Sequence, residues 1–220
     1  MADSINIRPF IEEQEGGLSR AKTDTASKLT APWTYKGYND WHTNAGVTYE
    51  SFIGLAPILK YAITPDNFFL MPDKIWGAIF KRGYWDQLEL DNIKSQVIAD
   101  TILTWAWGSG VTGAYKQLQK FLLKKGITVN SKKQVDDAFN NLVNVFNEKQ
   151  IFLELCEARK AFFISINQPA NLKGWLNRLE KFKTFGLNTI VKKKLKIITV
   201  ALILIVIIGA IGTFYYKQKD

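Results

Sequence analysis

The sequence offers little of the chemistry that thiols and imidazoles provide, because Cys156 is its only cysteine and His42 its only histidine. These counts exclude a disulfide within the chain and a zinc site built from cysteines and histidines. Cys156 lies in the apolar run IFLELCEARKAFF, where a thiol is typical of a core residue. No G-x-S-x-G motif supports a serine hydrolase. We therefore expect no metal, no cofactor and no thiol catalysis.

Negative charge is also scarce, since 29 Lys and Arg face only 20 Asp and Glu and leave a net charge of +9. This excess favours an anionic partner, which could be nucleic acid, a membrane surface or an acidic cell-wall polymer. The basic residues do not cluster along an aromatic-rich groove and form no nucleic-acid-binding motif, so we expect no nucleic acid. The 220 residues suit one domain, or one domain with a small appendage.

Charge is absent altogether from IITVALILIVIIGAIGTFYY, residues 197–216. At about 1.5 Å per helical residue, this stretch matches a hydrocarbon core of roughly 30 Å. Tyr215 and Tyr216 stand where an interfacial aromatic belt is expected. The stretch predicts one C-terminal transmembrane helix in contact with membrane lipid.

Lysines flank this stretch unequally, with Lys192, Lys193, Lys194 and Lys196 before it and Lys217 and Lys219 after it. The positive-inside rule then places the N-terminal side in the cytoplasm. The first residues, MADSINIRPF, lack the apolar core of an export signal. We expect a single-pass anchor in the inner (cytoplasmic) membrane, with a soluble domain that is cytoplasmic by lysine balance and periplasmic when it acts.

A short amphipathic helix is predicted near the N-terminus. Ser4 can cap it, and Ile7, Phe10 and Ile11 share one face by their spacing. The glycine pair 16–17 is expected to end the helix, because glycine accepts the left-handed conformation of a C-terminal cap.

Glu15 differs from the two glutamates that precede it. It continues the apolar face four residues beyond Ile11, whereas Glu12 and Glu13 point towards solvent. A partly desolvated carboxyl has a raised pKa and keeps the proton that a general acid donates. The alternative is that Glu15 pairs with a lysine or caps the fold, and helical spacing alone leaves both open.

The rest of the chain predicts an α+β, mostly α architecture: a helical body with a small hairpin lobe, followed by one transmembrane helix. Residues 19–47 are polar and turn-rich, and HTNAGVTYESF, residues 42–52, reads as a hairpin returning into a helix. Periodic apolar residues predict helices near 50–62, 72–80, 91–107, 113–125, 132–164 and 172–183. The segment 132–164 is either one helix or two with a break near Asn147.

Several motifs, taken in order, carry a family resemblance: E-G-G at residues 15–17, D-T-A-S at 24–27 and H-T-N-x-G-V-T at 42–48. They resemble glycoside hydrolase family 108, the N-acetylmuramidases of bacteria and phages. YWDQLELDNIKSQVIADTILTWAWGSG, YKQLQKFL, RKAFF and GWLNRLEKF are similar to the predicted peptidoglycan-binding domain that accompanies the family. The resemblance implies a lysozyme-like fold, peptidoglycan as partner, and cleavage of the β-1,4 bond between N-acetylmuramic acid and N-acetylglucosamine.

The resemblance implies catalytic roles for Glu15, Asp24 and Thr43. Glu15 falls on the family's general acid, Asp24 is the best candidate for the second carboxylate, and Thr43 would hold water on the opposite face of the sugar. Asp40 could replace Asp24. The family often has an aspartate and a proline where this chain has Ala21 and Lys22, and the segment 28–41 is longer than usual.

Four residues of the polar lobe are predicted to contact substrate. Trp33 and Trp41 are the tryptophans placed near a glycan, whereas the other five are better explained as core. His42 and Asn44, in the same turn as Thr43, complete this set.

These predictions divide the chain into a catalytic part (1–70), a helical peptidoglycan-binding part packed on it (71–185), a basic linker (186–196) and the membrane helix (197–216). The predicted function is a membrane-anchored muramidase, either a phage endolysin or a wall-remodelling enzyme. The alternative is a catalytically weak lysozyme-fold protein that acts as a membrane-anchored peptidoglycan-binding or assembly component of a virion or secretion machine.

Overall fold

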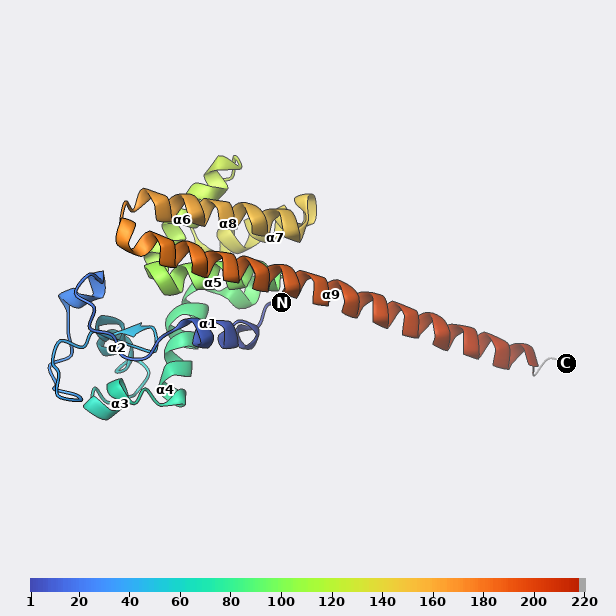
Figure 1. Cartoon of the computed structure of the whole chain (residues 1–220). Helices are drawn as coiled ribbons and strands as arrows, with labels where there is room; N and C mark the ends of the chain where they lie inside the picture. Colours follow the sequence, from blue (N-terminus) through green and yellow to red (C-terminus); the bar gives the residue numbers. More distant parts are fainter. Residues whose placement is uncertain (218–220) are drawn as a thin grey trace.

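The computed structural model describes the backbone of residues 1–217 and the side chains of residues 1–205, 207 and 208. Within that part, helices dominate and a single short hairpin is present (Figure 1). The α-helices are α1 (Arg8–Gln14), α2 (Tyr49–Leu55), α3 (Pro65–Phe69), α4 (Asp73–Ala78), α5 (Gln96–Ser109), α6 (Val111–Lys124), α7 (Lys132–Phe146), α8 (Glu148–Ser165) and α9 (Pro169–Lys217). The 3-10 helices are η1 (Ser4–Asn6), η2 (Thr25–Lys28), η4 (Asp86–Leu88) and η5 (Leu90–Asn92), and η3 (Ile79–Trp85) is a π-helix that continues α4. This architecture agrees with the mostly α part of the predicted fold class and is consistent with a lysozyme-like fold.

The first helix forms where the apolar spacing predicts it, but both of its ends differ from the prediction. The predicted apolar face is buried. Ser4 does not cap the helix: α1 follows Ile7 without a side-chain cap, and Asp3 instead caps the preceding η1, with its carboxylate accepting from the amide of Ile5 at 3.0 Å. At the other end α1 stops at Gln14, because Glu15 is already extended (φ −90°, ψ 123°). The glycines that follow do not take a left-handed φ, so the predicted glycine cap is wrong.

The predicted hairpin is present. Strands β1 (Thr43–Asn44) and β2 (Val47–Thr48) pair antiparallel around a turn in which Ala45 and Gly46 both have positive φ. Thr48 then caps α2 by accepting from the amide of Ser51 at 3.1 Å. The lobe with α2 and α3 lies at one end of the molecule (Figure 1).

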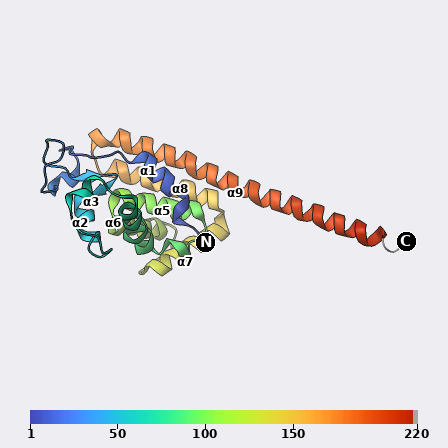
Figure 2. The same ribbon diagram turned by 90° about the horizontal axis from the view of Figure 1, so that it is seen from below.

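Helix α5 lies at the centre of the helical body, between the lobe side and the layer formed by α7, α8 and the first part of α9 (Figures 1 and 2). It is buried along most of its length, from Val97 to Ala106. Helices α7 and α8 are separate, because Asn147 takes a positive φ of 75° and caps α8 through the amide of Gln150 at 3.0 Å. Of the two alternatives for residues 132–164, the structure thus has two helices with a break at Asn147.

Helix α9 runs without interruption through the segment predicted as a linker. Its first part packs on α8 and α5, burying Leu179, Phe182 and Ile190, and its second part extends away from the body (Figures 1 and 2). Gly186 marks the close crossing, because a Cβ there would collide with the ring of Phe152. The proposed domain boundaries stay a prediction.

The predicted membrane span, residues 197–216, forms part of α9, and its residues 206 and 209–216 lie outside those whose side chains are described. Among the described residues, no helix combines the length and the apolar character needed to cross a membrane. This finding overturns the predicted single-pass anchor and the inner-membrane location that was inferred from it.

Candidate active site

The carboxyl group of Glu15 lies where three distant parts of the chain meet. Trp107, near the end of α5, donates its indole Nε1–H to Oε1 of Glu15 at 3.0 Å. Arg178, on α9, places Nη1 3.7 Å from the same oxygen. The Glu15 side chain is 16% exposed and that of Arg178 is 48% exposed. The acid is thus partly enclosed, while its cationic neighbour remains in contact with solvent.

The hairpin turn covers the other side of this carboxyl. Gly46 has a φ of +77°, and a Cβ at that position would lie 2.6 Å from both Cδ and Oε2 of Glu15. Both the left-handed backbone conformation and the lack of space for a side chain therefore require glycine at position 46. The turn residue that the sequence motif contains is the one that lets the hairpin lie directly against the acid.

Three influences act on the pKa of Glu15. Burial raises it and is the largest, while the charge of Arg178 and the hydrogen bond from Trp107 both lower it, and the outcome is a raised pKa. Neither Asp24 nor Asp40 is among these influences. A carboxyl whose proton is retained to higher pH can act as a general acid.

Aromatic rings form the wall behind Glu15. The ring of Trp107 lies 5.6 Å from that of Trp76, 5.9 Å from Phe80 and 4.7 Å from Tyr84. Trp76 also donates its Nε1–H to the carbonyl oxygen of Ala45 at 2.9 Å, which ties α4 to the hairpin turn. Burial, together with the charge of Glu15, raises the pKa of the Tyr84 phenol.

Sequence reasoning assigned these tryptophans to the core and did not connect Trp107 or Arg178 with Glu15. One feature of the sequence could have predicted part of the aromatic wall behind Glu15. Trp76, Phe80 and Tyr84 recur every four residues, which places them on one face of the helical segment 73–85. That face is the one that meets Trp107.

Thr43 lies on the hairpin that touches Glu15. Its carbonyl accepts from the amide of Ser19 at 2.8 Å, which attaches the segment after α1 to the edge of β1. Its hydroxyl is 2.9 Å from Nδ1 of His42, and the Nε2 of His42 is 3.2 Å from the carbonyl oxygen of Ala21. His42 is fully buried and Thr43 is half-buried.

The two aspartates considered as second carboxylate lie elsewhere in the lobe. Asp24 is exposed and caps η2, with Oδ1 accepting from the amide of Ala26 at 3.0 Å. Asp40 lies 3.9 Å from Arg20, whose guanidinium stacks on the ring of Tyr38 at 3.9 Å. Among the described residues, no hydrogen bond or ion pair joins either aspartate to Glu15.

The other three residues predicted to contact substrate hold the lobe together. Trp41 is buried and donates its Nε1–H to two carbonyl oxygens in the loop before it. Asn44 is buried and donates to the carbonyls of Phe68 and Phe69 at 2.7 and 2.9 Å. Trp33 is half-buried and packs edge-on against Phe69. Trp33 therefore retains the most exposed surface of the three.

Residues 8–110 match the family described as Glycosyl hydrolase 108. The match includes Glu15, the hairpin and Trp107, and it ends before Arg178. It suggests a lysozyme-type glycoside hydrolase acting on peptidoglycan, the class that the sequence motifs also implied.

One solved structure, titled "Structure of Brucella abortus SagA", is similar to this chain with a TM-score of 0.60 and 21% sequence identity. The alignment covers 84% of this chain and 94% of SagA. At this identity the likeness shows a shared fold. No curated protein matches the chain.

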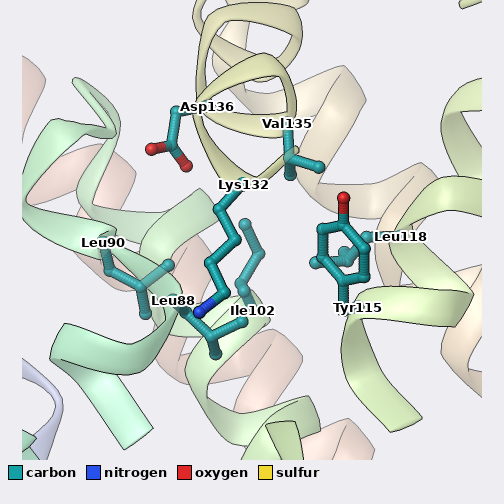
Figure 3. A pocket seen from close by; sticks show the side chains of 8 residues that line it. All are labelled: Leu88, Leu90, Ile102, Tyr115, Leu118, Lys132, Val135 and Asp136. Atoms are coloured by element: carbon teal, nitrogen blue, oxygen red, sulfur yellow. The ribbon is translucent and has the colours of Figure 1, made fainter. Parts of the chain in front are cut away.

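A small cavity lies apart from Glu15, between η4, η5, α5, α6 and α7 (Figure 3). Its lining is mostly apolar, with Lys132 and Asp136 as the charged members. Burial raises the pKa of Asp136 to about 7. The volume of about 210 Å³ includes space that is open to solvent. The chemistry gathered around Glu15, and not this cavity, identifies the candidate active site.

Proposed function

We propose that the protein is a peptidoglycan hydrolase of the N-acetylmuramidase type, which cleaves the β-1,4 bond between N-acetylmuramic acid and N-acetylglucosamine. The observation that carries this proposal is the Glu15 carboxyl, which is partly enclosed between Trp107 and Gly46 and has a raised pKa. The family match over residues 8–110 supports the same reaction class.

Glu15 is the proposed general acid. Its Oε1 already accepts a hydrogen bond from Trp107 and lies near Arg178, so the proton is expected on Oε2. As the glycosidic C–O bond breaks, that proton passes to the leaving oxygen and the sugar develops oxocarbenium character. The carboxylate that remains is stabilised by the hydrogen bond from Trp107 and by the nearby charge of Arg178, which favours completion of the proton transfer.

A second group must supply or activate the nucleophile. We propose that the Thr43 hydroxyl holds a water against the sugar carbon and that Asp24 takes the proton which this water releases. Asp40 is the alternative base. In an inverting glycosidase the two carboxyls stand ~6.5–9.5 Å apart, and in a retaining one ~5–5.5 Å apart.

The proposed substrate contacts follow from the exposure of the lobe residues. Trp33 is proposed to contact the glycan, while Trp41, His42 and Asn44 shape the lobe that holds Thr43. The net charge of +9 favours approach to the anionic wall. The role could be phage lysis or bacterial wall remodelling.

A second candidate function is binding of peptidoglycan without efficient cleavage, as part of an assembly. It is favoured by the charge of Arg178, which lowers the pKa of Glu15 and so weakens its hold on the proton. This charge would weaken an enzyme that needs a protonated Glu15, and it would not weaken a binding protein.

Muropeptide release from purified peptidoglycan by the full chain distinguishes these functions. Glu15→Gln keeps the size and polarity of the side chain but cannot donate the proton, so release should fall at least about 100-fold. Glu13→Gln is the matched control, because Glu13 is an exposed glutamate two residues before Glu15, in the last turn of α1. Products of the parent should carry N-acetylmuramic acid at their reducing ends. Equal release by the parent and Glu15→Gln would refute the assignment, and binding without release in every variant would favour the second function.

A further inference from the structure

His42 binds two different partners through its two ring nitrogens. Nε2 lies 3.2 Å from the carbonyl oxygen of Ala21, and Nδ1 lies 2.9 Å from Oγ1 of Thr43. The imidazole has no exposed surface. It therefore has no solvent partner that could substitute for either contact.

These partners determine which nitrogen carries the proton. A carbonyl oxygen only accepts hydrogen bonds, so Nε2 must donate to Ala21. A neutral imidazole has one N–H, which leaves Nδ1 as an acceptor. The only donor that Thr43 can offer to Nδ1 is its hydroxyl, so the Thr43 hydroxyl proton points at His42.

We propose that His42 is a positioning residue, whose Nδ1 accepts the hydrogen bond from the Thr43 hydroxyl so that the Thr43 oxygen presents only lone pairs to the attacking water. This inference rests on the proposed muramidase function. The half-buried Thr43 would then accept a hydrogen bond from the water and direct a water lone pair at the sugar carbon. As the new C–O bond forms, the water proton goes to the second carboxylate and the Glu15 proton goes to the leaving oxygen. Thr43 and His42 neither gain nor lose a proton overall.

The backbone around this pair is held in place before substrate arrives. The amide of His42 donates to the carbonyl of Ser19 at 3.1 Å, and the carbonyl of Thr43 accepts from the amide of Ser19 at 2.8 Å. The carbonyl of His42 accepts from the amide of Tyr49 at 2.7 Å, where α2 begins. A hydroxyl oriented in this way does not have to reorganise during the reaction.

Two substitutions separate positioning from a purely structural role. His42→Asn can place its amide oxygen near the site of Nδ1 and keep the acceptor for Thr43, but it loses the bond to Ala21. His42→Gln can reach the carbonyl of Ala21 with its amide nitrogen, but it loses the acceptor. Each variant gives up one of two hydrogen bonds, so a structural role predicts similar effects on both thermal stability and activity.

The positioning role predicts that the two variants differ in activity. In the full chain, His42→Gln and Thr43→Val should lower kcat for muropeptide release about tenfold with KM unchanged, a loss expected for one well-placed hydrogen bond. His42→Asn and the conservative Thr43→Ser should stay within about threefold of the parent. The double variant His42→Gln/Thr43→Val should be no slower than Thr43→Val, because the Nδ1 acceptor has no hydroxyl to orient once Thr43 is replaced. Equal losses in His42→Asn and His42→Gln would overturn the proposal.

A second measurement does not depend on activity. His42 is the only histidine, so the ring nitrogens of the ¹⁵N-histidine-labelled full chain give one set of NMR signals. We expect the Nε2–H tautomer, with the Nδ1 signal shifting in Thr43→Val and the Nε2 signal unchanged. An Nδ1–H tautomer would overturn the proposal. If the parent released no muropeptides, the proposed function would fail. The nitrogen shifts would still decide whether His42 accepts a hydrogen bond from the Thr43 hydroxyl.

Discussion

Trp107 donates its indole N–H to Oε1 of Glu15 at 3.0 Å, although 92 positions separate the two residues in the sequence. This bond connects the centre of the helical body to the end of the first helix. It also opposes the effect of burial on the acid, because a donor to the carboxylate stabilises the ionised form. The chemistry of Glu15 thus depends on the packing of α5.

Trp107→Phe should raise the pKa of Glu15 further, since the aromatic ring stays and the donor is lost. We expect the alkaline limb of the activity profile to move to higher pH, and the free energy of unfolding to fall by about 1 kcal/mol. Trp105→Phe is the matched control. Trp105 lies on the same helix, and its buried Nε1 has no hydrogen-bond partner among the described residues. An equal shift of the alkaline limb in both variants would contradict the role of the Trp107 donor.

Arg178→Gln should also raise the pKa of Glu15, because a positive charge 3.7 Å from Oε1 favours the carboxylate. The parent and variant should differ most at low ionic strength, since the guanidinium is half-exposed and its field is screened by salt. Lys181→Gln removes the same charge from an exposed position on the same helix. Muropeptide release as a function of pH, at two salt concentrations, checks both points. A shift as large in Lys181→Gln would show that net charge alone matters.

Gly46→Ala should abolish most activity, because the new methyl group would occupy the space of the Glu15 carboxyl. It should also destabilise the fold, by about 1–3 kcal/mol for the left-handed backbone alone. Gly37→Ala provides the control, because Gly37 has the same φ of +77° but no atom within 4 Å of its Cβ position. Activity per folded molecule should therefore fall in Gly46→Ala and persist in Gly37→Ala, with folding checked by thermal unfolding. Retained activity in Gly46→Ala would show that the turn does not hold the acid.

Asp100 should make the protein less stable as the pH rises. It is fully buried in α5, with one oxygen bonded to Gln96 at 2.7 Å, and burial raises its pKa from 3.8 to about 8. Between these two pH values the folded chain binds one more proton than the unfolded chain. The free energy of unfolding therefore falls through this window, by at most about 1.4 kcal/mol per pH unit, and the decline ends above the folded pKa.

Asp100→Asn should flatten this dependence, because the amide is neutral at every pH. Urea unfolding at pH values from about 3.5 to about 9 spans this window and checks the prediction. Asp136, whose pKa is raised to about 7, should leave a residual slope of the same sign. An unchanged slope in Asp100→Asn would contradict the assignment, and the exposed Asp66→Asn serves as the control.

Local signals in the sequence were sufficient to predict the helix and the hairpin next to Glu15. The spacing of Ile7, Phe10 and Ile11 identified the buried face of α1, and the turn chemistry around Gly46 identified the hairpin. These features depend on residues close in sequence, where helical period and backbone conformation dominate. The same spacing singled out Glu15 from its two exposed neighbours.

Contacts between distant segments could not be predicted from such local signals. Trp107 and Arg178 reach Glu15 only because α5 and α9 pack beside α1, and nothing local to either residue indicates that. Asp24 shows the limit of a local signal, because a carboxylate near the motif also caps a 3-10 helix, and its catalytic role stays a prediction. The uncharged stretch 197–216 predicted a membrane anchor, and no described helix meets the requirements for one.

The most direct test of the account compares the ionisation of Glu15 with catalysis in one buffer series. The carboxyl carbon of Glu15, identified by its loss in Glu15→Gln, is followed by NMR in the full chain while muropeptide release is measured at each pH. We predict that Glu15 titrates above the usual range for glutamate and that release declines as it ionises. Titration within the usual range, or release that persists after Glu15 has ionised, would contradict its role as the proton donor.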